Sequence, residues 1–186
     1  MPLEVEIKIA ITDLAAIRTR IAVLGFRVHK RRALEINTIF DTPGFALRRN
    51  GKLIRIRTIG RRKILTYKAP GQPGKHKSRE EIELSLSDAM AMREVFSRLG
   101  YGEVFRYEKY RAEFEKPDEK GIVTIDETPI GNFLELEGDP AWIDRTAALL
   151  GYCEADYITN SYGGLYLAHR KRNRRAPKDM VFPTLN

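Results

Sequence analysis

Charged residues alternate with apolar residues along one segment of this chain after another. The pattern begins in Glu4-Val5-Glu6-Ile7-Lys8. Successive side chains of a β-strand point to opposite faces, so this spacing places the charged side chains on one face and the apolar ones on the other. A single strand of this kind is typical of a sheet edge whose polar face lies in water. Its repetition on many strands, with both signs of charge, constrains the fold.

The later strands carry their charges at the same spacing. The alternating positions are Arg55, Arg57, Lys68, Arg79, Glu81, Glu83, Lys109, Arg111, Glu113, Glu115, Asp126, Glu135 and Glu137. Amphipathic helices must bury their apolar stripes, and the apolar faces of these strands are the available surface. The charged faces therefore lie on the other side, where they are solvated in an open sheet or line the lumen of a closed barrel.

Turn, capping and periodicity signals divide the chain into an α+β succession of elements. Helices are expected from Thr12 or Asp13 to Gly25, at about 88–99, from 139–140 to 150 and at 160–169, with a short helical piece at 46–50. Strands are expected up to residue 11 and at 26–40, 52–59, 63–68, 79–86, 101–115, 122–128 and 133–137.

An internal repeat at an offset of 75 residues matches Leu24-Gly25-Phe26 to Leu99-Gly100-Tyr101. The same offset superimposes the charged positions of 4–8 on those of 79–83. We interpret the chain as two related halves, each opening with a charge-faced strand that continues into a capped helix. A third Leu-Gly-aromatic ending at 150–152 leaves shared cap chemistry as an alternative explanation.

Composition excludes several classes of protein. With 186 residues and 42% hydrophobic side chains, the chain suffices for one substantial domain. It has no apolar run of membrane-spanning length, and no hydrophobic segment follows Met1. The lone cysteine, Cys153, excludes an internal disulfide and a multi-cysteine zinc site. We expect a cytoplasmic protein, a monomer or a homodimer, without a membrane partner.

The formal charge of +8 is concentrated at the C-terminus. Residues 170–186 carry Arg170, Lys171, Arg172, Arg174, Arg175 and Lys178 against Asp179. A terminal basic cluster is typical of a solvated tail, with nucleic acid or an acidic partner as the alternative. We expect a domain at 1–170 and a basic tail at 171–186, whose deletion from residue 172 onward changes little, and we do not expect nucleic acid as the partner.

A lumen that holds many charges is costly unless they pair or bind a charged ligand. Carboxylates close together suit Mg²⁺ or Mn²⁺, whereas Arg and Lys suit phosphate oxygens. A metal-bound polyphosphate satisfies both sets. Mutual ion pairing produces the same pattern, so the patterning alone leaves both explanations open.

The chain resembles the CYTH domain, or triphosphate tunnel metalloenzyme, family over roughly residues 1–170. The resemblance rests on Glu4, Glu6 and Lys8, on 40–43, 53–57, 66–71 and 78–83, on Lys109 and Arg111, on 124–126, on Glu135 and Glu137, and on Ser161-Tyr162. The chain departs from the pattern at Asn37 and Ile39, where many members carry an acidic residue and a tyrosine, and in its basic tail.

The resemblance implies an eight-stranded antiparallel β-barrel, a tunnel with a charged lumen flanked by amphipathic helices, which binds a triphosphate with Mg²⁺ or Mn²⁺. The implied metal ligands are Glu4, Glu6, Asp126, Glu135 and Glu137. The implied substrate contacts are Lys8, Arg55, Arg57, Lys68 and Arg111, with Arg79, Lys109, Glu81 and Glu83 as further lining residues. Glu4, Glu6, Lys68 and Arg111 are also implied in catalysis.

The resemblance implies an enzyme, and the nucleophile decides which one. With water, it is a triphosphatase acting on tripolyphosphate, thiamine triphosphate or a nucleotide; with the ribose 3′-hydroxyl of ATP, it is a class IV type adenylate cyclase. We favour hydrolysis because cyclisation also needs a ribose pocket, which the sequence does not identify. A non-catalytic binder of polyphosphate or RNA phosphates is a further alternative.

Overall fold

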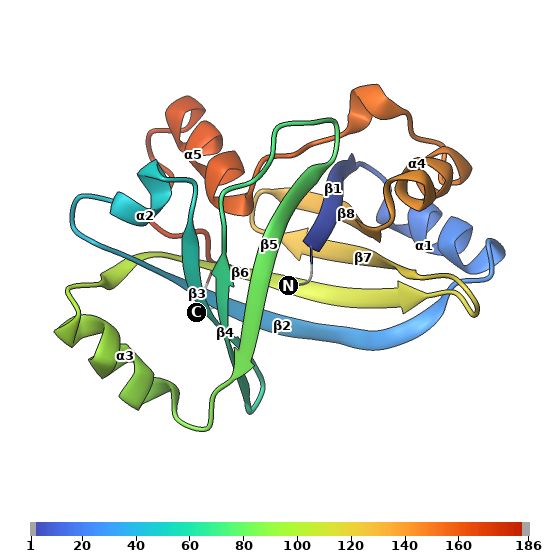
Figure 1. Ribbon diagram of the computed structural model, residues 1–186. Helices are drawn as coiled ribbons and strands as arrows, with labels where there is room; N and C mark the ends of the chain where they lie inside the picture. The colour runs from blue at the N-terminus through green and yellow to red at the C-terminus, as the bar shows by residue number, and fades with distance from the viewer. Residues whose placement is uncertain (1–2, 184–186) are drawn as a thin grey trace.

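The computed structural model describes residues 3–183 and contains the predicted α+β fold (Figure 1). The strands are β1 (Leu3–Ile11), β2 (Arg27–Asp41), β3 (Leu53–Ile59), β4 (Arg62–Lys68), β5 (Lys77–Ser85), β6 (Gly102–Glu115), β7 (Gly121–Thr128) and β8 (Gly131–Gly138). The helices are α1 (Leu14–Val23), α2 (Ala46–Arg49), α3 (Ala89–Arg98), α4 (Pro140–Leu149) and α5 (Tyr162–Arg172), with a 3-10 turn η1 (Glu154–Asp156). Within the described range, no helix has the length and apolar character needed to cross a membrane.

The eight strands close into an antiparallel barrel in the order β1-β5-β4-β3-β2-β6-β7-β8, which confirms the predicted barrel. The ring closes because β1 pairs with β5 on one side and with β8 on the other. Two strands separate the β1–β8 pair from the β3–β2 pair on each side of the ring: β5 and β4 on one side, and β6 and β7 on the other. These two pairs form opposite walls of the lumen.

The internal repeat is present in the structure. The offset of 75 residues carries α1 onto α3 and their capping residue Asp13 onto Asp88, and the side chain of each cap accepts a backbone N–H of its helix. If each strand of the first half is exchanged with its counterpart in the second half (β1 with β5, β2 with β6, β3 with β7 and β4 with β8), every strand pair of the ring is retained. The opening strands of the two halves lie side by side, with Glu4 opposite its counterpart Arg79. The barrel thus has the connectivity of a two-fold repeat.

The apolar faces of the strands point outward, where helices cover them. α1 and α4 lie next to each other against β1 and β8, while α3 covers a different part of the ring (Figure 1). Ile17 of α1 and Ile143 of α4 belong to the larger core with Leu134 of β8. Phe96 of α3 packs against Phe40 of β2 in a second core. This arrangement leaves the charged faces to the lumen.

The C-terminal segment packs against the barrel, so the predicted solvated tail is wrong for its second half. The backbone N–H of Met180 donates to the carbonyl of Arg106 at 3.0 Å, and the N–H of Glu108 donates to the carbonyl of Met180 at 2.8 Å. The side chain of Met180 is fully buried beside Tyr107. α5 also continues to Arg172, past the predicted domain boundary, and residues 184–186 lie outside the described range.

Met180→Ala tests whether this segment is part of the folded unit. Removing a fully buried methionine side chain should lower the free energy of unfolding by about 2–5 kcal/mol. Urea denaturation measures the change. Arg174→Ala, at an exposed position of the same segment, serves as the control and should change it by less than about 0.5 kcal/mol. Equal stability of the two variants would contradict the packing role.

Candidate active site

A cavity of about 1020 Å³ occupies the barrel lumen, and Lys and Arg outnumber Asp and Glu among its lining residues. The predicted site residues that line it are Glu4, Glu6, Lys8, Arg55, Arg57, Lys68, Arg79, Lys109, Arg111, Glu135 and Glu137. Asp126 is not among its lining residues, and Glu81 and Glu83 are. Alternation along each strand, combined with closure of the ring, therefore brings the predicted charges into one space.

The β1–β8 wall carries a group of carboxylates. Glu6 lies directly opposite Glu137 in the strand register, and Glu4 is the next lumen-facing residue of β1. Burial raises the pKa of Glu137 to about 7, and the negative charges of Glu4 and Glu6 add to the effect. Burial and Glu6 also raise the pKa of Glu4. The negative charge of this wall is therefore incompletely compensated at Glu4 and Glu137.

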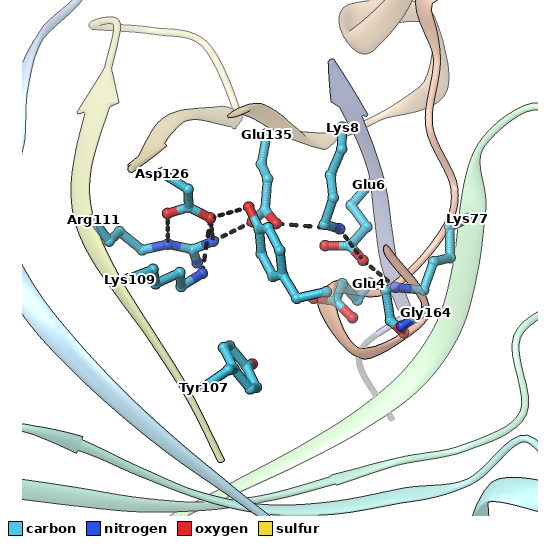
Figure 2. Close-up of polar contacts among 12 residues, drawn as sticks. Glu4, Glu6, Lys8, Lys77, Tyr107, Lys109, Arg111, Asp126, Glu135 and Gly164 are labelled. Carbon is cyan, nitrogen blue, oxygen red and sulfur yellow. Dashed lines mark hydrogen bonds and ion pairs between the residues drawn. The ribbon is translucent and has the colours of Figure 1, made fainter. Parts of the chain in front are cut away.

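Lysines of β1 and of neighbouring strands hold these carboxylates. Lys68 of β4 donates to both carboxylate oxygens of Glu4 at 2.7 Å. Lys8 donates to Glu6 at 3.3 Å (Figure 2). Lys77 of β5 also donates to Glu6. Burial alone raises the pKa of Glu6, but Lys8 and Lys77 outweigh it and hold that pKa far below its usual value. Burial lowers the pKa of Lys77 to about 8.

Asp126, which the resemblance implies as a metal ligand, is the centre of a second group, on β6 and β7. Its carboxylate accepts hydrogen bonds from Lys109 at 2.8 Å, from Arg111 at 2.7 Å and from the Tyr162 hydroxyl at 2.6 Å (Figure 2). The residue is fully buried. Arg111 also forms an ion pair with Glu135. Two cations and a hydroxyl therefore occupy the carboxylate of Asp126 in this structure.

The β2–β3 wall is the more basic one. Arg55 donates to the hydroxyl of Tyr107 at 3.2 Å. Glu35 lies 3.7 Å from Nε of Arg57 and 3.6 Å from Nζ of Lys109. Burial by itself raises the pKa of Glu35, but Lys109, followed by the neighbouring arginines, outweighs it and lowers the pKa to about 2. This wall is held in place by ion pairs.

The sequence reasoning did not identify Lys77 and Tyr107, which line the cavity, or Glu35, which lies beside Arg57 and Lys109. Lys77 lies two residues before Arg79, and Tyr107 lies two residues before Lys109. Extending the alternation by one step along those two strands would have identified both. Glu35 belongs to the alternation of β2, which was not included among the charged strands.

The donor set of the β1–β8 wall fits a hard divalent cation. Within residues 3–183, no three carboxylate, imidazole or thiol side chains converge in the geometry of a metal site. In this structure the carboxylates of Glu4 and Glu6 form ion pairs with Lys68, Lys8 and Lys77 instead. Oxygen ligands and a local excess of negative charge are what Mg²⁺ and Mn²⁺ prefer. Carboxylates released from the lysines would supply these ligands.

Comparison with known proteins gives a consistent result. Residues 2–162 match the family model of the CYTH domain. A protein of Methanocaldococcus jannaschii, named as a candidate adenylate cyclase, is 34% identical over 135 residues, covering 73% of this chain and 76% of that protein. A Pyrococcus horikoshii structure is 26% identical with a TM-score of 0.74, covering 90% of this chain and 99% of that one. A Hippeastrum candidate adenylyl cyclase with a dominant triphosphatase activity is 17% identical with a TM-score of 0.68, covering 89% and 96%, and shows the fold alone.

Glu35→Gln tests the ion pairs of the β2–β3 wall through their pH dependence. The folded-state pKa of Glu35 is lowered to about 2, so its contribution to stability is present above about pH 4.5 and is lost as pH falls toward 2. The variant should be less stable than wild type at pH 7 by on the order of 2–3 kcal/mol. Urea denaturation at pH 7, 5 and 3 measures the difference.

The difference between Glu35→Gln and wild type should shrink between pH 5 and pH 3. Glu94→Gln provides the control, because Glu94 is an exposed residue of α3 paired only with Arg98. A stability difference for Glu35→Gln that is the same at all three pH values would contradict the assignment.

Proposed function

This chain belongs to the CYTH domain family, and on that premise we propose that it is a divalent-metal-dependent phosphohydrolase of a triphosphate bound in the barrel lumen. The candidate substrates are tripolyphosphate, thiamine triphosphate and nucleoside triphosphates. The observation that carries the proposal is the separation of charge between opposite walls of one cavity, with carboxylates on β1 and β8 and arginines on β3. A metal-bound triphosphate is the chemistry that complements both walls.

The proposed metal ligands are Glu4, Glu6 and Glu137, with Glu135 beside them. The metal, Mg²⁺ or Mn²⁺, would neutralise charge on the phosphate oxygens and make water a better nucleophile. Raised pKa values at Glu4 and Glu137 support this assignment, because a cation would relieve the repulsion that raises them. Asp126 is assigned to positioning Lys109 and Arg111.

The proposed phosphate contacts come from the other strands of the ring. Arg55 and Arg57 extend from β3, and Arg111 extends from β6. Arg55 is held by Tyr107 and Arg111 by Asp126, so both guanidinium groups are oriented before a ligand binds. Oriented donors stabilise developing charge without reorganisation during the reaction. With a metal bound to Glu4, Lys68 would be free to hold a phosphate oxygen.

Cyclisation of ATP is the second candidate, and the name of the Methanocaldococcus jannaschii relative favours it. The two reactions share the phosphate site and differ in the nucleophile. Hydrolysis needs only a water molecule in line with the phosphorus, whereas cyclisation needs the ribose held so that its 3′-hydroxyl attacks. We favour hydrolysis on this ground. A non-catalytic polyphosphate binder is the third candidate.

Assays with tripolyphosphate, thiamine triphosphate and ATP, each with Mg²⁺ or Mn²⁺, separate the three candidates. We expect metal-dependent release of phosphate and no cyclic AMP. Cyclic AMP and pyrophosphate from ATP would identify a cyclase. Metal-dependent binding of all three compounds without turnover would identify a binder.

Glu6→Gln and Arg57→Ala test the two walls separately. Each should lower kcat/KM by about 100-fold or more, since one removes a metal ligand and the other a phosphate contact. Circular dichroism should show an intact fold for both. Glu94→Gln and Arg61→Ala, at exposed positions, are the matched controls and should retain wild-type activity. Wild-type activity in both lumen variants would refute the site assignment.

A further inference from the structure

The buried side-chain polar atoms that lack a hydrogen-bond partner among the described residues lie together on the β2–β3 wall. They are Oε2 of Glu35, Oδ1 and Nδ2 of Asn37, Nε of Arg55 and Nε of Arg57. Buried polar atoms are almost always paired in folded proteins, so a cluster of unpaired ones requires an explanation. Arg55 and Arg57 line the cavity, and Asn37 lies beside Arg57 in the sheet without being among the lining residues, so the cluster indicates a polar ligand at this wall.

Asn37 is central to this cluster. It lies opposite Arg57 in β3 and opposite Tyr107 in β6. Paired residues of antiparallel strands place their side chains on the same face, and both of these neighbours line the cavity. The side chain of Asn37 therefore faces the lumen, and its exposed fraction is 0%.

Neither the oxygen nor the nitrogen of this amide has a partner among residues 3–183. An unpaired buried polar group costs about 1–3 kcal/mol relative to a paired one. A leucine of similar size would avoid that cost. Groups that lower stability in this way are characteristic of binding sites, where a ligand supplies the missing partner.

Resting on the proposed function, we propose that Asn37 is a substrate-binding residue that holds the phosphate chain against the β2–β3 wall. Its Nδ2 donates to a phosphate oxygen together with Nε of Arg55 and Nε of Arg57. Its Oδ1 accepts an O–H donor next to that phosphate, because ionised phosphate oxygens only accept. The donor is water or a hydroxyl of the substrate.

The amide is suited to this position by its chemistry. A carboxylate there would accept the same O–H but would repel the phosphate, and a leucine would offer neither function. Asn37 also lies across the lumen from the carboxylates of β1 and β8. The phosphate chain would thus span the lumen between a metal on one wall and Asn37 with the two arginines on the other.

Asn37→Leu separates a binding role from a structural one, because the two predict opposite effects. In the ligand-free protein, its thermal midpoint should equal or exceed that of wild type, since the substitution removes an unpaired buried amide. Its affinity for β,γ-methylene ATP with Mg²⁺, measured by calorimetry, and its kcat/KM for tripolyphosphate should fall by about 10- to 100-fold. Thr38→Val, a buried position on the opposite face of β2, should leave both ligand measurements unchanged.

Asn37→Asp and a second substrate identify the partner of Oδ1. Asn37→Asp retains the acceptor but adds negative charge, and it should weaken binding at least as much as Asn37→Leu. If water is the donor, Asn37→Leu lowers the kcat/KM for tripolyphosphate and for ATP by the same factor. If Asn37→Leu lowers the kcat/KM for ATP by a larger factor than that for 3′-deoxy-ATP, the donor is the ribose 3′-hydroxyl.

Normal ligand binding by Asn37→Leu together with a lowered thermal midpoint would overturn this inference and leave the proposed function standing. In that case the amide is paired through internal water and serves the fold. Failure of wild type itself to bind any triphosphate would overturn the proposed function, and this inference with it.

Discussion

The desolvation of charge inside the barrel is the constraint on which the rest of this structure depends. Lys109 and Asp126 are both almost completely buried and lie 2.8 Å apart, because burying an isolated charge is strongly unfavourable. Each lumen strand therefore needs partners on its neighbours, and closure of the ring supplies them. The apolar faces then point outward, which is why helices such as α1 and α4 must cover the barrel. The cost of desolvating charge therefore accounts both for the charged inner face of the sheet and for the helices that cover its apolar outer face.

Charged groups are fully paired in one part of the lumen and incompletely paired in another, and the proposed site lies where the pairing is incomplete. Around Asp126, cations and a tyrosine satisfy the carboxylate fully. On the β1–β8 wall, by contrast, the pKa of Glu137 rises to about 7 because burial and neighbouring carboxylates disfavour its charge. On the opposite wall, Asn37, Arg55 and Arg57 have buried side-chain atoms without a hydrogen-bond partner among the described residues. Proteins retain such unfavourable groups where a ligand compensates them, which supports the proposal that the two walls form one binding site.

The two-fold repeat relates the acidic β1–β8 wall to the neighbouring strands β5 and β4, which carry different charges. The opening strands of the two halves pair with each other, which places Glu4 opposite Arg79, its own counterpart. Lys8 and its counterpart Glu83 also differ in charge. An acidic wall next to a mixed one therefore results from changing charges at equivalent positions, without changing the backbone. The C-terminal segment has no counterpart in the repeat, and through Met180 it supports Tyr107, which in turn holds Arg55.

The sequence alone determined which face of each strand is charged and where the helices begin, because alternation and Asp caps such as Asp13 act between near neighbours in the chain. It also indicated the barrel and most of the lumen residues, through the repetition of one pattern and a family resemblance. Only the tertiary structure decided which charges meet: Asp126 with Lys109 and Arg111, Glu35 with Arg57, and Lys77 with Glu6. It also decided that Met180 lies in the core. These contacts join residues far apart in the chain, and they exist only once the ring has closed and its strands have taken their register.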